Sequence, residues 1–462
     1  MKSKLFGTDG IRSKFGKTPL TTGTIKLIGY AFAKIMFNNN SGHIYISHDG
    51  RESCDSIEND LISGISYQGS SYTLLGLLPT PALSASMHQL KKKGTCAIQI
   101  TASHNEYRDN GLKFFDHRGN KINDALQDQI ENIVYSESSD IKTIKKNNTI
   151  DEDFKAIYVN FIREYYFTKL SNFLPINQKL NILVDCANGA FSKIIDHIFN
   201  DQNLNIIPIN NEPDGKNINY KCGATNPEQI SDFINFFNSQ KAKSSKEKSE
   251  ILKLDLGVAI DGDGDRAIFV DEYGNIIDGD DILFLLATND INNSKKVVGT
   301  LMTNYGIRQA YQDMGIDFLE TDVGDMNVIK KMQEFDCSYG GESSGHLIFN
   351  DFEDLFYGDS MITLINVIKL LLNSKKSLYN LHHHIKKIPS ELINIKVSNK
   401  STFLSNEKNM NIISYVKNEI GSNGRLLVRP SGTENVVRFL IEHRELREIN
   451  VLKSYIYDNI EN

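Results

Sequence analysis

The stretch Leu256-Gly-Val-Ala-Ile-Asp-Gly-Asp-Gly-Asp-Arg-Ala-Ile-Phe-Val-Asp271 joins two apolar runs through a short loop of alternating aspartate and glycine. Each run has the composition of a buried strand, so the stretch predicts a β-hairpin with an acidic loop at its tip. The glycines allow a tight turn, in which Asp261, Asp263 and Asp265 can converge on one hard cation. Without a cation, three crowded carboxylates would repel one another.

The spacing of this loop also begins like a calcium-binding EF-hand loop, with Glu272 at the twelfth position. However, Arg266 occupies the sixth position, where that loop needs glycine, and the flanking runs predict strands rather than helices. Few dedicated protein ligands, with room left for a phosphate oxygen, favour magnesium. A solvated acidic turn that binds no ion is the remaining alternative.

Four further short apolar runs have the character of buried strands in a parallel sheet. They lie at 43–49, 96–101, 181–185 and 297–302. Apolar residues at helical spacing in 52–69 and 362–372 predict helices in the same chain. The pattern predicts an α/β protein of several βα units, in which functional groups gather where the strands end.

The composition bounds the class of protein. The chain has 462 residues, enough for three or four domains, and its 40% apolar and 24% charged residues are ordinary for a globular protein. A net charge of −7 gives no indication of a nucleic-acid partner. Five scattered cysteines favour free thiols over disulfides or a zinc site. The sequence shows neither a signal peptide nor an apolar run of roughly 20 residues, so we expect a soluble, cytoplasmic protein with no membrane partner.

Three polar stretches divide the chain. The stretch 141–150 predicts a passage between domains. The stretch 240–249 is charged and contains no aromatic residue, so we interpret it as a mobile surface insertion. Changes of pattern at 374–377 and 381–389 indicate the entry to a last domain.

A serine follows the predicted strand 96–101 in the segment Thr101-Ala-Ser-His-Asn105, and Asp109-Asn-Gly-Leu-Lys113 comes next. We predict that Ser103 lies at a strand-to-helix corner, where backbone N–H groups can hold a phosphate and the hydroxyl can act as a nucleophile. The alternative is that Ser103 merely caps the next helix, as isolated serines commonly do.

The segment Gly340-Gly-Glu-Ser-Ser-Gly-His346 is a glycine-rich loop that suits a polyhydroxylated ligand. Glu342 can accept hydrogen bonds from two sugar hydroxyls, and Ser344 can bond a third. The loop also carries the imidazole of His346. Taken alone, the loop fits an ordinary turn equally well.

The segment Arg429-Pro-Ser-Gly-Thr-Glu434 suits a phosphate. Arg429 offers a bidentate fork, Ser431 and Thr433 offer hydroxyl donors, and N–H groups around Gly432 can complete an anion nest. A surface turn is the alternative for this loop alone. Together, the four loops contain a nucleophile, a cation site, sugar-binding groups and a phosphate clamp, which are the parts that phosphoryl transfer needs.

This ordered set of loops resembles the α-D-phosphohexomutase superfamily over essentially the whole chain. The opening Phe6-Gly-Thr-Asp-Gly-Ile-Arg12 is similar to the branch that acts on glucosamine phosphates, as are three later segments: Val184-Asp-Cys-Ala-Asn-Gly-Ala190, Gly223-Ala-Thr225 and Gly299-Thr-Leu-Met302. The resemblance implies three similar mixed-sheet α/β domains and a smaller C-terminal α+β domain around a central cleft. The expected limits are 1–155, 156–275, 276–385 and 386–462.

The resemblance also implies a role for each loop. Ser103 would be the phosphoserine, and its phosphoryl oxygen would complete a magnesium site with Asp261, Asp263 and Asp265. The residues implied to line the catalytic cleft are Arg12, His104 and Lys113. The residues implied to bind the substrate are Glu342, Ser344, His346, Arg429, Ser431, Gly432 and Thr433.

The implied reaction converts glucosamine 6-phosphate to glucosamine 1-phosphate through a glucosamine 1,6-bisphosphate intermediate, and it leads toward UDP-N-acetylglucosamine and peptidoglycan. A homodimer is common in the superfamily. Phosphoglucomutase or phosphomannomutase activity is the alternative within the superfamily. A phosphatase, or a non-catalytic protein that binds a sugar phosphate or calcium, is the alternative outside it.

The chain departs from the superfamily pattern at four positions. Ser13 replaces a usual glycine, Glu106 and Asn435 replace prolines, and Met326 replaces a basic residue. The last change removes an expected positive charge from the cleft, although Lys330 and Lys331 lie nearby in the sequence.

Overall fold

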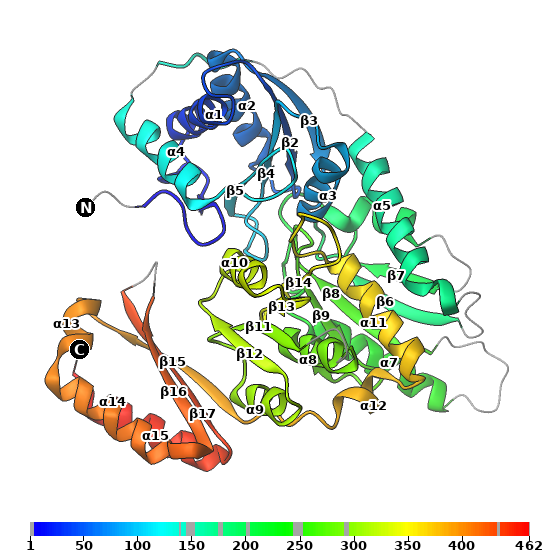
Figure 1. Cartoon of the computed structure of the whole chain (residues 1–462), viewed down its shortest axis with the longest axis vertical. Coiled ribbons are helices and arrows are strands. Elements are labelled where there is room, and N and C mark those ends of the chain that lie inside the picture. The colour runs from blue at the N-terminus through cyan, green and yellow to red at the C-terminus, as the bar shows by residue number, and fades with distance from the viewer. Residues whose placement is uncertain are drawn as a thin grey trace. The chain divides into compact units, whose positions relative to one another are not determined.

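The structure is a computed structural model that describes residues 4–137, 140–144, 153–173, 179–199, 204–243, 253–290, 295–431 and 435–461. The chain forms two compact units, Met1–Leu301 with Leu319–His382, and Met302–Phe318 with His383–Asn462. Four sheets follow one another along the sequence (Figure 1). The expected limits of the four domains stay a prediction.

The first sheet has five strands in the order β1-β5-β4-β2-β3. Its strands are β1 (Ile11–Lys14), β2 (His43–His48), β3 (Ser71–Leu77), β4 (Thr95–Ile100) and β5 (Asp109–Phe115). Its helices are α1 (Thr22–Met36), α2 (Cys54–Gln68), α3 (Thr80–Leu90) and α4 (Asp124–Ser136). β2 runs parallel to β3 and β4, whereas β5 returns antiparallel to β4 and β1. Helices α1, α2 and α4 bury one apolar core against this sheet (Figure 1).

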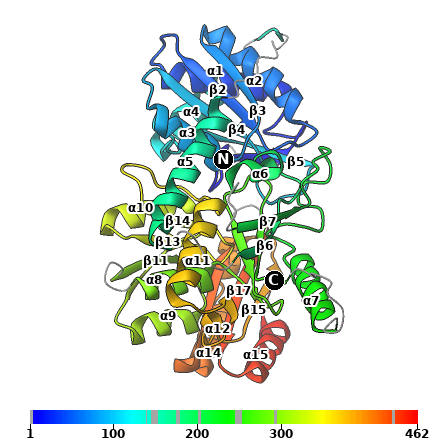
Figure 2. The same cartoon turned by 90° about the vertical axis from the view of Figure 1, so that its right-hand side faces the viewer.

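The second sheet has the order β10-β9-β8-β6-β7. Its strands are β6 (Leu180–Asp185), β7 (Leu204–Ile209), β8 (Leu256–Ile260), β9 (Ala267–Val270) and β10 (Ile276–Ile277). Its helical segments are α5 (Asp153–Leu170), η1 (Ser171–Phe173), η2 (Ala190–Lys193), α6 (Ile195–Ile198) and α7 (Glu228–Lys243). Ile230 and Ile234 of α7 pack against the sheet, beside which α7 lies in Figure 2.

The third sheet has the order β12-β11-β13-β14. Its strands are β11 (Lys296–Thr300), β12 (Asp317–Thr321), β13 (Tyr339–Gly341) and β14 (Leu347–Phe349). The helices of this part of the chain are α8 (Gly279–Asn289), α9 (Tyr305–Asp313), α10 (Asp325–Phe335), α11 (Ser360–Ser374) and α12 (Leu378–His382). Apolar residues of α10 pack against β11 and β14.

The last sheet has three antiparallel strands in the order β15-β17-β16. The strands are β15 (Ser390–Lys396), β16 (Gly424–Pro430) and β17 (Val436–His443). The helical segments are α13 (Lys400–Ser405), α14 (Glu407–Ile420), η3 (Gly421–Asn423) and α15 (Leu446–Asn459). The helices α13, α14 and α15 share one apolar core with this sheet, which agrees with the smaller α+β domain that the resemblance implies.

The first three sheets share one layout. In each, a parallel pair of strands is followed by an antiparallel return, from β4 to β5, from β8 to β9 and from β13 to β14. The loops 101–108, 261–266 and 342–346 therefore occupy the same position in their respective sheets. Three of the four predicted chemical loops are equivalent hairpin loops of a repeated unit.

The local predictions hold with one correction. All six predicted strands and both predicted helices are present. Helix α2 ends at Gln68, and the φ of +92° at its C-cap Gly69 is left-handed. The prediction of a strand-to-helix corner at Ser103 is wrong, because residues 109–115 return as β5 rather than beginning a helix. Ser103 therefore caps no helix.

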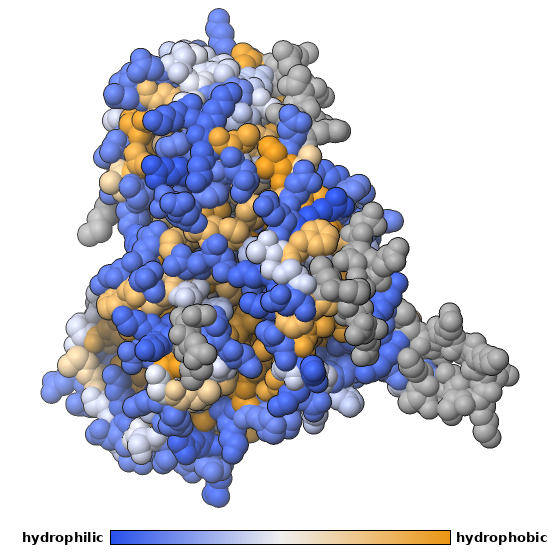
Figure 3. Space-filling view, turned by 45° about the vertical axis from the view of Figure 1, so that its right-hand side comes forward, coloured by the Kyte–Doolittle hydropathy of each residue, from blue (hydrophilic) through white to orange (hydrophobic). Residues whose placement is uncertain are grey.

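The remaining predictions have mixed outcomes. The five cysteines are free and buried, as expected. Within the described residues, no helix combines the length and apolarity that crossing a membrane requires, and hydrophilic side chains cover most of the face seen in Figure 3. Most of the predicted passage and insertion, at 145–150 and 244–249, lies outside the described residues.

Candidate active site

The acidic loop between β8 and β9 gathers three buried carboxylates. Asp261, Asp263 and Asp265 each offer one oxygen, and these atoms lie within 4.8 Å of one another. Gly264 permits the turn, because its φ is +81° and a Cβ there would lie 2.2 Å from the ring of Phe191. The predicted hairpin is confirmed, and the flanking strands exclude an EF-hand.

The electrostatics of this loop suit a cation. Burial raises the pKa of Asp261 well above its usual value, and repulsion from Asp265 and Asp263 adds to the rise. Within the described residues, Asp263 Oδ1 and Asp265 Oδ1 are buried and accept no hydrogen bond. Buried carboxylate oxygens without donors are the groups that a hard divalent cation would satisfy. The three aspartates therefore fit a metal ion.

Ser103 lies against this loop in the hairpin between β4 and β5. Its Oγ donates a hydrogen bond of 2.6 Å to Asp261 Oδ2, and its φ of +52° is unusual for a residue with a side chain. Arg51 Nη2 and Asn219 Nδ2 both donate to the carbonyl oxygen of Ser103, each at 2.8 Å. These bonds hold a strained backbone that aims the hydroxyl at the carboxylates.

Lys113, on β5, contacts the same carboxylates. Its Nζ donates to Asp263 Oδ2 at 2.8 Å and to Asp265 Oδ2 at 2.6 Å, and it lies 3.1 Å from Asp9 Oδ2. Burial alone would lower the pKa of Lys113, but these carboxylates raise it well above its usual value. The lysine therefore stays charged and offsets part of the negative charge of the loop.

Asp9 was not selected from the sequence, and it contacts both Arg12 and Lys113. Its Oδ2 accepts a hydrogen bond of 2.8 Å from Arg12 Nη2 and also faces Lys113. Burial would raise the pKa of Asp9, but Lys113, Lys121 and Arg12 hold it well below its usual value. The available signal was its place inside the Phe6–Arg12 motif.

His104 is the neighbour of the nucleophile candidate. Its Nδ1 lies 3.4 Å from Ser103 Oγ, which is long for a hydrogen bond. Burial, assisted by the positive charges of Arg266 and Arg12, lowers the pKa of His104 to about 4. The neutral imidazole therefore predominates at neutral pH.

The predicted sugar loop between β13 and β14 packs against the acidic hairpin. Ala267 N donates to the carbonyl oxygen of Gly345 at 3.1 Å, and a Cβ on Gly345 would meet Ala267 O at 2.4 Å. Glu342 Oε1 accepts a hydrogen bond of 2.9 Å from Gly324 N, at the start of α10. Glu342 and Ser344 are both half-buried in this loop.

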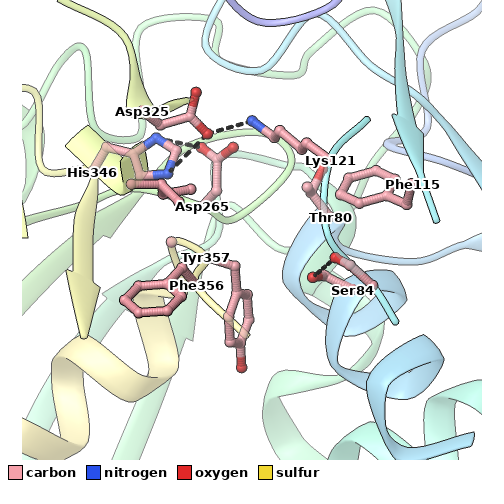
Figure 4. Close-up of a pocket in the computed structure, with 12 residues that line it drawn as sticks. Thr80, Ser84, Phe115, Lys121, Asp265, Asp325, His346, Phe356 and Tyr357 are labelled. Carbon is pink, nitrogen blue, oxygen red and sulfur yellow. Dashed lines mark hydrogen bonds and ion pairs between the residues drawn. The ribbon is translucent and has the colours of Figure 1, made fainter. Parts of the chain in front are cut away.

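His346 lies deeper than the rest of the sugar loop. Its Nδ1 is 3.9 Å from Asp265 Oδ1, and its Nε2 is 3.8 Å from Asp325 Oδ2. Figure 4 shows the imidazole between these two carboxylates on one wall of a pocket, with Lys121 reaching Asp325 from the other side. The structure thus places His346 beside the acidic loop.

The predicted phosphate clamp belongs to the second unit. Arg429 on β16 lies directly opposite Arg438 on β17, and two like charges in register favour a bound anion. Lys400 Nζ donates to the carbonyl oxygen of Ser431 at 2.7 Å, so a third positive charge lies near. Sequence reasoning missed Arg438 and Lys400. Gly432 and Thr433 lie outside the described residues.

The chain matches four models of phosphoglucomutase/phosphomannomutase domains in the expected order. They are alpha/beta/alpha domain I at residues 3–140, domain II at 156–274, domain III at 278–388 and the C-terminal domain at 392–458. A curated protein of Alcanivorax borkumensis named phosphoglucosamine mutase is 36% identical, over 98% of this chain and 97% of its own length. The chain belongs to the phosphoglucosamine mutase family. A second member, from Buchnera aphidicola, is 35% identical over 99% of this chain and 96% of its own.

Solved structures agree with this fold. A phosphoglucomutase/phosphomannomutase family protein of Burkholderia thailandensis superimposes with a TM-score of 0.73 at 21% identity, over 99% of this chain and 97% of its own. Phosphoglucosamine mutases of two bacteria are thus similar in sequence to this chain over nearly their whole length, and a more distant phosphoglucomutase/phosphomannomutase family protein shares the architecture.

The structure shows the surroundings of two residues that depart from the superfamily pattern, Glu106 and Met326. Glu106 contributes its carbonyl oxygen, which accepts from Arg51 Nη1, so the backbone around Ser103 is still held. Met326 lies on α10 and lines a hollow with Asp9, Lys113 and Lys121. The charge missing at Met326 is not restored by the two lysines nearby in the sequence. Their side-chain partners lie elsewhere: Lys330 bonds Asp124, and Lys331 bonds Glu334.

Proposed function

We propose that this chain interconverts glucosamine 6-phosphate and glucosamine 1-phosphate, with Ser103 carrying the phosphoryl group in transit. The observation that carries the proposal is the Ser103 hydroxyl at 2.6 Å from Asp261, inside a cluster of buried carboxylates. Two family members named phosphoglucosamine mutase, similar over their full length, support the choice of substrate.

In the proposed reaction, the bond between Ser103 Oγ and phosphorus breaks as the sugar O1 bonds to phosphorus. The proton of the O1 hydroxyl passes to a base of the protein, and glucosamine 1,6-bisphosphate results. After the sugar has turned around, the bond between O6 and phosphorus breaks as Ser103 Oγ bonds to phosphorus. O6 takes up the proton that the base received in the first step, and glucosamine 1-phosphate is released. The neutral His104 beside Ser103 and the charged Lys113 are the groups available to move protons and to balance charge.

The carboxylates of Asp261, Asp263 and Asp265, with an oxygen of the phosphorylated Ser103, would hold Mg²⁺. The ion would supply positive charge against the transferring phosphoryl group. Lys113 supplies further positive charge from the protein itself, since it is held in the ammonium form. Arg12, fixed by Asp9, offers a guanidinium group to a phosphate.

The remaining residues are proposed to orient the sugar. Glu342 and Ser344 would bond ring hydroxyls, and His346 would complete that wall of the site. The groups proposed to hold the phosphate that is not reacting are Arg429, Ser431, Gly432 and Thr433. Because the sugar turns around between steps, this clamp must accept either phosphate.

Turnover of three sugars by magnesium-loaded protein, primed with a trace of sugar 1,6-bisphosphate, tests the proposal. We expect preference for glucosamine 6-phosphate over glucose 6-phosphate and mannose 6-phosphate, and loss of activity in Ser103→Ala. Preference for glucose 6-phosphate or mannose 6-phosphate would show that the protein is instead a phosphoglucomutase or a phosphomannomutase. No isomerisation of any sugar by phosphorylated protein would refute the mutase. The cytoplasmic location and the homodimer stay predictions.

A further inference from the structure

Lys121 binds two carboxylates that come from distant parts of the sequence. It follows β5, and its Nζ lies 2.5 Å from both Asp9 Oδ1 and Asp325 Oδ2. Its side chain is 15% exposed. Burial would lower the pKa of Lys121, but Asp325 and Asp9 raise it. The lysine is therefore a charged link between the loop before β1 and the first turn of α10. Figure 4 shows its contact with Asp325.

The link closes a ring of charged and ionisable side chains. From Asp9, the ring continues to Lys113 at 3.1 Å and to Asp265 at 2.6 Å. From Asp325, it continues to His346 at 3.8 Å and from there to Asp265 at 3.9 Å. Acidic and basic groups alternate around the ring, and Asp265 belongs to the acidic loop. The members in order are Lys121, Asp9, Lys113, Asp265, His346 and Asp325.

The same link reaches the sugar loop. Asp325 is the first residue of α10, and the preceding Gly324 donates its N–H to Glu342 Oε1 at 2.9 Å. Gly324 has a φ of +112°, so the direction of this N–H depends on a backbone conformation that few residues adopt. Holding Asp325 therefore also fixes the donor that orients Glu342.

Met326, the residue that follows Asp325, makes the contact between Lys121 and Asp325 more important in this chain. Met326 brings no charge to the first turn of α10. The side-chain hydrogen bonds of Lys330 and Lys331 go to Asp124 and to Glu334. The positive charge at this turn is thus supplied by Lys121.

We propose that Lys121 is a positioning residue that couples the sugar loop to the phosphoryl-transfer centre. It does so by holding Asp9 against Lys113, and by holding Asp325 next to Gly324, whose N–H binds Glu342. This inference rests on the proposed function, because the sugar loop and the phosphoryl-transfer centre that Lys121 couples are parts of the proposed active site. In this role Lys121 acts through Asp9 and Asp325, the two carboxylates that it binds.

A double-mutant cycle with Lys121→Met and Glu342→Ala tests the coupling. We expect Lys121→Met to lower kcat/KM for glucosamine 6-phosphate at least tenfold, and Lys121→Arg to recover most of the loss. In the Glu342→Ala background, the loss from Lys121→Met should be at least threefold smaller, because the N–H of Gly324 then has no side-chain acceptor at position 342. Equal losses in both backgrounds would overturn the inference.

The matched control is Lys330→Met. This lysine also joins α10 to the first α/β part, through an exposed 2.7 Å contact with Asp124 that does not touch the ring. Its loss should change kcat/KM less than twofold in either background. If Lys330→Met lowers kcat/KM as much as Lys121→Met does, the inference is overturned. Any ion pair between α10 and the first α/β part would then have the same effect on the reaction.

Two measurements keep the test decisive. Thermal unfolding identifies a variant that fails to fold, and Lys121→Gln then replaces Lys121→Met in the cycle. If the wild type binds glucosamine 6-phosphate without isomerising it, the proposed function fails. The Kd for glucosamine 6-phosphate, measured by calorimetry for the same four proteins, then tests the coupling. If Lys121→Met weakens binding by different factors in the two backgrounds, the coupling is supported. Equal factors overturn it.

Discussion

At the residue scale, Asp9 is the side chain on which the arrangement of positive charge depends. It accepts contacts from Arg12, Lys113 and Lys121. Removing one partner of a buried charge pair costs about 3–5 kcal/mol, because the other charge is left uncompensated. We therefore expect Asp9→Asn to lower the Tm and to reduce kcat at least tenfold.

Asp124→Asn is the control for Asp9→Asn. It breaks an exposed pair with Lys330, and exposed pairs contribute about 0–1 kcal/mol. Scanning calorimetry and steady-state kinetics should show almost no effect for Asp124→Asn. A wild-type kcat in Asp9→Asn would show that the charges around Lys113 do not matter for the reaction.

Gly345 offers a test of the sugar loop. Its φ is +87°, and an added Cβ would collide with the carbonyl oxygen of Ala267. Gly345→Ala should therefore displace the loop and raise the KM for glucosamine 6-phosphate by about tenfold, since a lost polar contact to a ligand costs on the order of 1–2 kcal/mol. Gly23→Ala in α1 has open space around it and should leave KM unchanged. Equal KM values for both variants would contradict a role of the loop in sugar binding.

At the element scale, α11 begins at a buried carboxylate. Asp359 accepts hydrogen bonds from Met361 N and Ile362 N, and from the hydroxyls of Tyr158 and Tyr357. Burial raises the pKa of Asp359 to about 6. The folded protein therefore holds this proton more tightly than the unfolded chain does.

Because the pKa of Asp359 is raised in the folded protein, this carboxyl group stabilises the fold more at low pH than at high pH. The stabilisation from the protonated Asp359 is complete below about pH 4 and is lost as the pH rises through about 6, a change of about 3 kcal/mol. Relative to Asp359→Asn, whose amide does not titrate, the wild type should lose Tm between pH 4 and pH 7. Differential scanning calorimetry of both proteins at four pH values measures this. A Tm difference that is independent of pH would contradict it.

The elements also show which local features the sequence could predict. Apolar runs such as 96–101 became strands because their side chains are buried on both faces of a sheet, as the six buried residues of β4 are. The direction of the next element was not predictable in the same way. The sequence predicts a strand-to-helix corner at Ser103, but pairing with β4 and β1 makes the next element, 109–115, a strand. That pairing turns Ser103 into a hairpin residue.

At the scale of the whole molecule, the site depends on contacts between residues far apart in the chain. Ser103 and Asp261 are 158 positions apart, and Lys121 and Asp325 are 204 apart. The loops that carry recognisable motifs could be predicted individually, since each motif is local. Lys121 could not be selected, because its partners are brought near only by the fold. Asp9 lies inside the Phe6–Arg12 motif, but its contacts with Lys113 and Lys121 also arise only in the fold.

Metal removal is a test at this scale. A cation that binds the folded protein and not the unfolded chain stabilises the fold by mass action. Mg²⁺ should therefore raise the Tm of the wild type by a few degrees, on the order of the shift that 1–2 kcal/mol produces in a large domain. In Asp263→Asn the rise should be less than half as large. An equal rise in both proteins would place the bound cation elsewhere.

The most direct test of the central claim is to follow the phosphoryl group itself. Protein incubated with ³²P-labelled glucosamine 1,6-bisphosphate should carry the label on the peptide that contains Ser103, and unlabelled glucosamine 6-phosphate should then chase the label into glucosamine phosphates. Ser103→Ala should stay unlabelled. Label on another residue, or release of the label from the wild type only as inorganic phosphate, would contradict the account.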